Sequence, residues 1–278
     1  MSDNGIPVST GGWVFDVDGV LTDTASLHYR AWKALFDRVL PSTVRSFGPD
    51  DYHRLVDGRP RLVGLRAVLS DRGLDIPTGS ESDPPGVGTV RAMAALKQQE
   101  FLGLLDTVGV RVFPDALLLL DRLDGVGVPA AAASASRNMH RVLASAGIES
   151  RFRATVDGND AAALHLEPKP RPDLFLEAAR RLRTTPDRCA LVEDALAGVR
   201  AGHEGGFHPV VGVDRSGGKW STQLSRWADI VVPALDRLDP TAPLRPPGGR
   251  GRRPRPGTGP RGTAPDGRGP SDGPRTAP

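Results

Sequence analysis

The stretch WVFDVDGVLTDT, residues 13–24, decides how the chain folds and which chemistry it can carry. Its first five residues are mostly apolar, which predicts a buried strand. Asp16 and Asp18 stand at the end of that strand, before a Gly and a Thr-Asp-Thr turn. Two carboxylates this close cannot stay equally acidic, because each negative charge raises the pKa of the other. One can attack as a nucleophile while the other carries a proton; the plainer alternative is an acidic surface turn.

Five further apolar runs have the length of buried strands, and helical patterns separate them. The runs lie at 128–133, 152–156, 189–192, 209–213 and 230–232, and the helical patterns at 116–123, 139–146, 172–182 and 195–201. Alternation of strands and helices is typical of a parallel, Rossmann-like α/β sheet. Active sites of such sheets lie at the carboxyl ends of the strands, which is where Asp16 and Asp18 stand.

One interval interrupts this alternation. No strand is predicted between residues 17 and 128, where helical patterns at 26–40 and 91–105 flank a polar, Gly/Pro-rich segment at 71–88. An insertion directly after the first strand would overhang the carboxyl edge of the sheet and act as a lid. We therefore predict an α/β core at 8–24 and 107–240, with a helical cap inserted at 25–106.

The C-terminal segment has the composition of a disordered tail. Residues 241–278 contain 10 Pro and 9 Gly, and Leu244 is their only aliphatic side chain larger than Ala. They cannot bury enough apolar surface to offset the entropy lost on ordering. From residue 245 onward, 8 Arg and 2 Asp give +6, so the net charge of +3 leaves −3 for residues 1–244. A basic tail can contact nucleic acid, but a solvated extension is the simpler interpretation, and no nucleic-acid partner is expected.

The rest of the composition predicts a cytoplasmic enzyme. Cys189 is the only cysteine, which excludes an internal disulfide and a cysteine metal cluster. The N-terminus MSDNGIPVST has neither a basic nor an apolar region, so no signal peptide is predicted. The longest apolar run near mid-chain, at 116–120, is far too short to span a bilayer. We expect a monomer with no membrane partner.

Two further motifs carry groups that suit phosphate binding. In AASASRN, residues 132–138, a buried strand ends in small hydroxyl residues whose following backbone amides can cradle an anion; an ordinary helix N-cap is the alternative. In EPKPRPD, residues 167–173, Lys169 stands between two prolines that stiffen its backbone. A cation held beside a carboxylate nucleophile and a phosphoryl group would stabilise both, although most isolated lysines only lie in surface loops.

A fourth motif, LVEDALAG at 191–198, brings Glu193 and Asp194 to the end of a predicted strand. Two adjacent acids are unfavourable there unless a cation or hydrogen-bond donors satisfy them. Mg²⁺ would explain both this pair and the pair formed by Asp16 and Asp18. The weaker alternative is an acid pair that favours the N-terminus of the next helix.

Taken together, in this order and spacing, the four motifs resemble the haloacid dehalogenase superfamily of phosphotransferases. Dehalogenases of the superfamily lack the second aspartate, so Asp18 favours phosphoryl transfer. The segments FDVDGVLTDTASLHYRAWKAL, SASRN, KPRPD and VFPD are also similar to the β-phosphoglucomutase-like subgroup. The resemblance covers residues 13–238 and does not extend to the tail.

This resemblance implies a role for each site residue. Asp16 would be the nucleophile that carries the phosphoryl group, and Asp18 the general acid/base. Mg²⁺, the expected cofactor, would be held by Asp16, the backbone carbonyl of Asp18, and Asp194, with Glu193 close by. The transferring phosphate would be bound by Ser134, Ala135 and Lys169. The distal phosphate would be gripped by Arg59, Ser136, Arg137 and Asn138, and the hinge and sugar side of the pocket would be shaped by Thr24, His28 and Trp32.

The chain departs from the subgroup's pattern at three places. Arg137 replaces a lysine, which keeps the charge and changes the geometry. The segment LKQQ at 96–99 stands where the subgroup has Lys-Arg-Lys-Asn, so Lys97 is left to take over part of that role. Ala195 stands where well-studied members have a serine.

Three functions follow from these patterns. The first is a mutase that interconverts β-glucose 1-phosphate and glucose 6-phosphate through the 1,6-bisphosphate, with a cap that keeps water from the aspartyl-phosphate. The second is a phosphatase acting on a small phosphorylated sugar, with the same Asp16 and Asp18 but water as acceptor. The third and least favoured is a non-catalytic binding protein, against which the intact set of acids argues.

Overall fold

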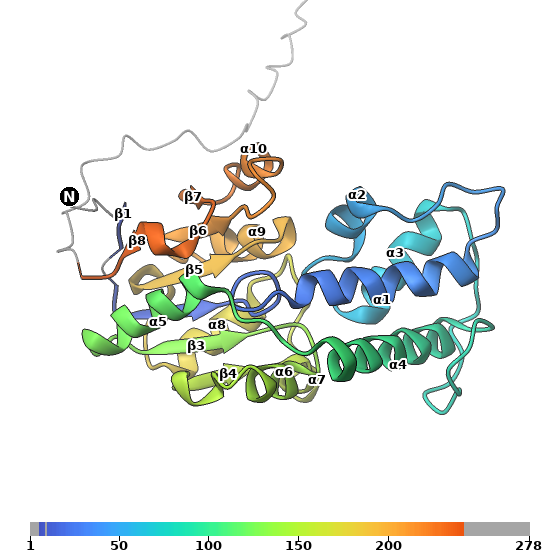
Figure 1. The fold of residues 1–278 in the computed structure, drawn as a ribbon, viewed down its shortest axis with the longest axis horizontal. Coiled ribbons are helices and arrows are strands. Elements are labelled where there is room, and N and C mark those ends of the chain that lie inside the picture. The colour runs from blue at the N-terminus through green and yellow to red at the C-terminus, as the bar shows by residue number, and fades with distance from the viewer. Residues whose placement is uncertain (1–5, 9, 242–278) are drawn as a thin grey trace, which may run out of the picture. The chain divides into compact units, whose positions relative to one another are not determined.

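The computed structural model describes residues 6–8 and 10–241, which contain a six-stranded parallel sheet (Figure 1). Neighbouring strands follow the order β4-β3-β2-β5-β6-β7. The strands are β2 (Gly12–Phe15), β3 (Ala130–Ala133), β4 (Ala154–Val156), β5 (Cys189–Glu193), β6 (Val210–Val213) and β7 (Ile230–Val232). Every strand expected from the sequence is present, so the predicted Rossmann-like α/β fold is confirmed.

The register of β2 with its two neighbours places the candidate site. Phe15 pairs with Ala132 of β3 on one side and with Val192 of β5 on the other. The three strands therefore end at the same edge of the sheet, and the residues that follow them emerge side by side. Because the chain adds strands first on one side of β2 and then on the other, β2 lies at the switch point where ligands bind in such sheets.

Helices cover both faces of the sheet, which explains why its strands are continuously apolar. The side chains of Trp13 and Phe15 lie in a buried cluster with α5 (Pro114–Gly125) and α6 (Met139–Ser145). Val14 lies in a second cluster on the opposite face, with α8 (Asp173–Arg181) and α9 (Leu196–Glu204). Successive side chains of a strand point to opposite faces, so the central strands β2, β3 and β5 contribute to both clusters.

Between β2 and β3 the chain forms a helical cap with its own buried cluster. α1 (Thr24–Val39) lies alongside α4 (Val90–Val108) in Figure 1. The cap also contains α2 (Pro49–Asp51), the π-helix η1 (Tyr52–Val56) and α3 (Arg61–Asp71). Its cluster, separate from the two sheet clusters, includes Trp32, Leu35, Phe36, Phe47, Leu65, Val68 and Met93. The helices expected at 26–40 and 91–105 are present, while the cap limits of 25–106 stay a prediction.

Shorter elements complete the described chain. They are α7 (Gly158–Ala163), α10 (Ser221–Leu224), the 3₁₀-helices η2 (Glu149–Arg151), η3 (Pro186–Arg188) and η4 (Leu235–Arg237), and a parallel pair of β1 (Ile6–Pro7) and β8 (Leu238–Asp239). Within residues 6–8 and 10–241, no helix is long and apolar enough to cross a bilayer. Apart from Thr241, the segment predicted to be disordered lies outside the described residues.

Candidate active site

The chain leaves the sheet for the cap through a tightly hydrogen-bonded loop. Gly19 has a φ of +86°, a conformation that glycine adopts without strain, and its N–H donates to the Thr22 carbonyl (2.8 Å). The return connection from the cap runs beside the outgoing one, because the Asp23 N–H donates to the Arg111 carbonyl (2.9 Å). The loop that follows the two aspartates is therefore continuous with the connection to the cap.

Lys169 joins the predicted nucleophile to β5. Its Nζ lies 2.6 Å from Asp16 Oδ1 and 2.6 Å from Glu193 Oε1, and all three side chains are buried. Burial lowers the pKa of Lys169, but the charges of the two carboxylates raise it well above its usual range. Burial raises the pKa of Asp16 to about 8, with Lys169 opposing the rise and the charge of Glu193 adding to it. One cation is thus shared by two buried carboxylates at this edge of the sheet.

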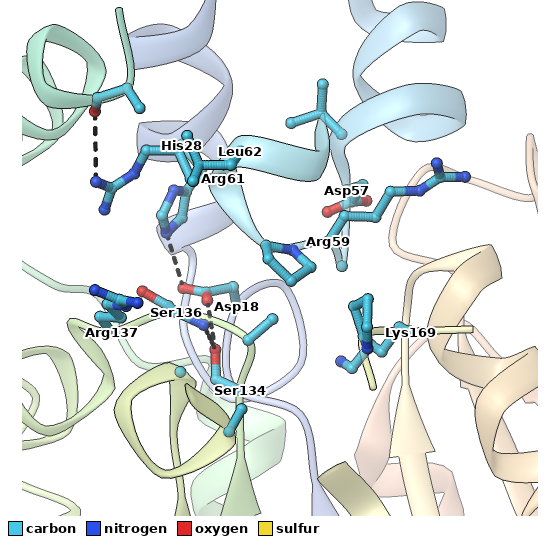
Figure 2. Close-up of a pocket in the computed structure, with 18 of the residues that line it drawn as sticks. Asp18, His28, Asp57, Arg59, Arg61, Leu62, Ser134, Ser136, Arg137 and Lys169 are labelled. Atoms are coloured by element: carbon cyan, nitrogen blue, oxygen red, sulfur yellow. Dashed lines mark hydrogen bonds and ion pairs between the residues drawn. The ribbon is translucent and has the colours of Figure 1, made fainter. Parts of the chain in front are cut away.

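Asp18 is held by three polar neighbours, as the dashed contacts in Figure 2 partly show. Thr24 Oγ1 donates to Asp18 Oδ1 (2.5 Å), Ser134 Oγ donates to Oδ2 (3.2 Å), and His28 Nε2 lies 3.5 Å from Oδ1. Burial by itself raises the pKa of Asp18, but the interactions with His28, Thr24 and Ser134 lower it to about 2. Asp18 is therefore ionised near neutral pH and can accept a proton from a hydroxyl group.

Asp194 adds a carboxylate to the same edge. A Cβ built on Gly19 would lie 1.9 Å from Asp194 Oδ2, so this carboxylate packs directly against the backbone beside Asp18. Burial, and then the negative charge of Asp57 and of other nearby carboxylates, raises the pKa of Asp194 well above its usual range. Asp57 comes from the cap, so acids from both parts of the chain meet here.

These oxygen atoms fit a hard divalent cation. Among the described residues, no three His, Cys, Asp or Glu side chains form a metal-binding group. Asp16 and Asp194, with the backbone carbonyl of Asp18, would supply two carboxylates and one carbonyl, which are oxygen donors of the kind that Mg²⁺ prefers. A cation there would lower the raised pKa values of both carboxylates. Glu193 accepts bonds from Lys169 and from the Ala195 N–H (2.6 Å), so its carboxylate is already engaged.

A cavity of about 590 Å³ separates the sheet edge from the cap. This volume lies in the range typical of small-molecule sites. Most of the predicted site residues line it: Asp16, Asp18, His28, Trp32, Arg59, Ser134, Ala135, Ser136, Arg137, Lys169 and Asp194. Three do not: Thr24 and Glu193 lie behind Asp18 and Lys169 as their hydrogen-bond partners, and Asn138 bonds to the cap.

A second cap arginine, Arg61, lines the cavity together with Arg59, although the sequence did not point to it. Figure 2 places Arg61 and Arg137 on the same side of Asp18, whereas the side chain of Arg59 extends away from it. Burial, and then the charge of Arg137, lowers the pKa of Arg61 to about 10. Arg59 donates to the Arg54 carbonyl at 3.4 Å. Two guanidinium groups that face one another suit an anion between them.

Gln98 connects this arginine pair to the core. It accepts a bond from Arg61 and exchanges two bonds with Asn138, from Gln98 Nε2 to Asn138 Oδ1 (2.8 Å) and from Asn138 Nδ2 to Gln98 Oε1 (3.1 Å). Gln98 stands in the LKQQ segment, so this departure from the subgroup's pattern supplies the polar group that joins Arg61 to Asn138. In the sequence, the only feature that could have pointed to Gln98 was its position next to Lys97.

His28 and Lys97 form a second link between the cap helices and Asp18. The His28 ring stacks on Phe101 with centroids 4.0 Å apart, and Lys97 Nζ lies 2.7 Å from His28 Nδ1. Lys97 is buried over the rings of Trp32 (5.2 Å) and Phe101 (4.8 Å). Burial and then Lys97 lower the pKa of His28, while burial and then neighbouring Arg61 lower the pKa of Lys97 well below its usual range. An anionic ligand would favour the charged forms of both.

Comparison with known proteins agrees with this arrangement. Residues 12–206 match the family model of the haloacid dehalogenase-like hydrolases. The chain belongs to this family. A β-phosphoglucomutase of Mycobacterium bovis is 41% identical over 244 residues, which cover 84% of this chain and 93% of that protein. A β-phosphoglucomutase of Bacillus subtilis is 32% identical over 226 residues, 79% and 87% of the two chains.

A solved structure of this haloacid dehalogenase-like group has the same fold. The β-phosphoglucomutase of Clostridium difficile superposes with a TM-score of 0.66 at 26% identity, over 82% of this chain and 92% of that one. The predicted superfamily and its β-phosphoglucomutase-like subgroup are therefore confirmed. The chain is an enzyme, either a phosphomutase or a closely related phosphatase.

Proposed function

We propose that the enzyme is a Mg²⁺-dependent β-phosphoglucomutase that converts β-glucose 1-phosphate to glucose 6-phosphate through the 1,6-bisphosphate. A mutase needs two phosphate sites, one at the nucleophile and one at a distance. The observation that best supports it is the pair of facing guanidinium groups, Arg61 and Arg137, across the pocket from Lys169. The 41% identity to a named β-phosphoglucomutase supports the same reaction.

In this proposal Asp16 attacks the phosphorus of the donor phosphate. The Asp16 oxygen–phosphorus bond forms as the bond from phosphorus to the sugar oxygen breaks. Ser134 and Lys169 line the pocket beside Asp16 and would hold the transferred group, while Mg²⁺, when bound by Asp16, Asp194 and the Asp18 carbonyl, neutralises charge on the phosphoryl oxygens. Such an ion would also lower the raised pKa values of Asp16 and Asp194, which favours the ionised form of the nucleophile.

Asp18 is proposed to move the proton. It is ionised at neutral pH, and its bonds to Thr24 and Ser134 keep it beside Asp16. It would take the proton from the sugar hydroxyl that attacks the aspartyl-phosphate and return it to the leaving oxygen in the other half-reaction. Its bond to Thr24, the first residue of α1, ties its orientation to the base of the cap.

A sugar-phosphate phosphatase is the second candidate. It would use the same two aspartates, with water as the acceptor, so the core residues do not distinguish the two reactions. The observation that favours it is the Gln98–Asn138 pair, because these two side chains satisfy each other where a distal phosphate would need free donors. A cytoplasmic location and a monomeric state also stay predictions.

The product separates the two candidates. The enzyme is supplied with pure β-glucose 1-phosphate, Mg²⁺ and a trace of the 1,6-bisphosphate, and glucose 6-phosphate and free phosphate are measured together. We expect glucose 6-phosphate to exceed free phosphate, and Asp16→Asn to abolish both. Free phosphate that accumulates without glucose 6-phosphate would establish the phosphatase instead.

A further inference from the structure

The core loop at residues 214–220, between β6 and α10, contacts the cap directly. Lys219 Nζ lies 2.8 Å from Asp50 Oδ1, although the two residues are 169 positions apart in the chain. The next residue, Trp220, packs its ring against the His53 ring with centroids 4.6 Å apart. Asp50 and His53 belong to α2 and η1, so two successive residues of the loop hold two successive elements of the cap.

The loop is held in one conformation from within. The buried carboxylate of Asp214 accepts bonds from the backbone N–H groups of Ser216 and Trp220, both at 3.0 Å. Gly217 and Gly218 have φ values of +79° and +98°, so the chain can turn sharply between these two anchors. Lys219 and Trp220 are therefore presented to the cap by a fixed turn.

From Trp220, contacts lead through the cap into the active site. His53 Nδ1 lies 3.2 Å from Asp57 Oδ2, and the Asp57 side chain lines the cavity with only 6% of its surface exposed. A Cβ built on Gly58, the next residue, would lie 3.1 Å from Ala195 Cβ. The cap segment that Trp220 supports thus rests on Ala195, which follows Glu193 and Asp194 at the end of β5.

The same loop also contacts the connection beside the catalytic aspartates. Arg215 donates to the carbonyls of Gly19 (3.1 Å) and Val20 (3.0 Å), in the turn that follows Asp18. Arg215 also pairs with Asp115 at the start of α5 (2.9 Å). One short loop therefore contacts both the base of the cap connection and the part of the cap that closes over the site.

We propose that loop 214–220 latches the cap over the active site, with Lys219 and Trp220 as positioning residues. The inference rests on the proposed transfer through an aspartyl-phosphate, which a closed cap protects from water. When the latch is broken, water reaches this group more often. The water oxygen then bonds to phosphorus as the bond from phosphorus to Asp16 breaks, a water proton passes to Asp18, and inorganic phosphate leaves.

Charge reversal tests the ion pair. The side chains of Asp50 and Lys219 are 75% and 54% exposed, so Asp50→Lys and Lys219→Asp leave the core intact. Each single variant should raise the ratio of free phosphate to glucose 6-phosphate by about two- to fivefold, the range open to an exposed ion pair. The double variant restores the pair in reverse and should return the ratio toward that of the parent enzyme.

The matched controls change the same kinds of contact at places where the contact does not join the cap to the core. Lys33 and Asp37 form an exposed pair (2.7 Å) within α1, so Lys33→Asp and Asp37→Lys should leave the ratio unchanged. Trp220→Leu should raise the ratio as the charge variants do. Trp227→Leu should not, because the Trp227 ring contacts His203 (5.4 Å), which also lies in the core.

A distance measurement tests the latch without reference to the product. Spin labels on Ser70→Cys in the cap and Asp187→Cys in the core report closure, since both positions are exposed and Cys189 is buried. Latch variants should broaden the distance distribution, and the control variants should not. If no form makes glucose 6-phosphate, the mutase proposal fails while the distances still decide the latch. The latch proposal would be overturned if the latch variants matched the parent enzyme in both label distances and product ratio. It would also be overturned if the double charge-reversal variant restored neither quantity.

Discussion

Lys169 Nζ lies 2.6 Å from Asp16 Oδ1, although 153 positions separate the two residues. The same ammonium lies 2.6 Å from Glu193 and 4.5 Å from the centroid of the Phe175 ring. The stiff loop that carries Lys169 thus places a buried cation between the predicted nucleophile and the end of β5. Lys169 donates a hydrogen bond to Asp16, so the reactivity of Asp16 depends on this partner.

Removing that cation should damage both stability and turnover. Lys169→Met leaves Asp16 and Glu193 as buried carboxylates without their shared partner, and breaking a buried pair in this way costs about 3–5 kcal/mol. We expect a clearly lower melting temperature and a kcat reduced at least ~100-fold, because the transferred phosphate loses its ammonium. Lys33→Met, which breaks an exposed pair, is the control and should change neither. A Lys169→Met enzyme with normal kcat would remove Lys169 from the phosphate site.

The two cap arginines should differ sharply. Arg61→Ala removes a largely buried guanidinium that faces Arg137, and the loss of charge-assisted bonds of about 1.5–3 kcal/mol corresponds to a roughly 10- to 150-fold lower kcat/KM. Arg59→Ala should lower it less than about threefold, because an exposed polar contact contributes little. Steady-state kinetics on the sugar phosphate measures both. A larger effect from Arg59 would restore the assignment made from the sequence.

The metal-free enzyme should lose stability as the pH rises. Asp16 has its pKa raised from 3.8 to about 8, so the unfolded chain releases this proton near pH 4 while the folded chain keeps it until about pH 8. The raised pKa of Asp16 therefore stabilises the folded state fully below pH 4, and this contribution is lost as the pH rises through 8. In EDTA, the melting temperature of Asp16→Asn minus that of the parent should therefore increase from pH 5 to pH 8.

Added Mg²⁺ supplies the control for this pH effect. A bound cation lowers the pKa of Asp16, so the same difference in melting temperature should vary less with pH when Mg²⁺ is present. A difference that stays constant from pH 5 to pH 8 in EDTA would mean that Asp16 is already ionised at pH 5.

Gly198 should tolerate no side chain. A Cβ built there would lie 1.8 Å from Glu193 Oε1, so Gly198→Ala must push this carboxylate away from Lys169. We expect a lower melting temperature and a lower kcat. Gly103→Ala is the matched control, because Gly103 lies in α4 with no atom within 4 Å of its added Cβ, and the change should stabilise the helix by about 0.5–1 kcal/mol. Equal effects from the two substitutions would contradict the packing described for Glu193.

The sheet and the position of Asp16 and Asp18 at its carboxyl edge could be predicted from the sequence because the signals are local. An apolar run predicts burial of its own residues, and the acids that follow it mark the end of the strand. The choice between Arg59 and Arg61 could not be made in this way. Both stand in the stretch DGRPR, residues 57–61, and α3 begins at Arg61. Only the direction in which that helix starts turns one guanidinium toward Arg137.

The sequence by itself determined the α/β core, the helical insertion after β2 and the four motifs that carry the acids, the hydroxyls and Lys169. Only the tertiary structure decided how distant segments meet. Lys97 and His28 are 69 positions apart, Gln98 and Asn138 are 40 apart, and Lys219 and Asp50 are 169 apart. Such contacts depend on how the cap packs on the core. The sequence pattern of one segment does not predict which distant segment it contacts, because the hydrophobic periodicity of a segment indicates only which of its own residues are buried.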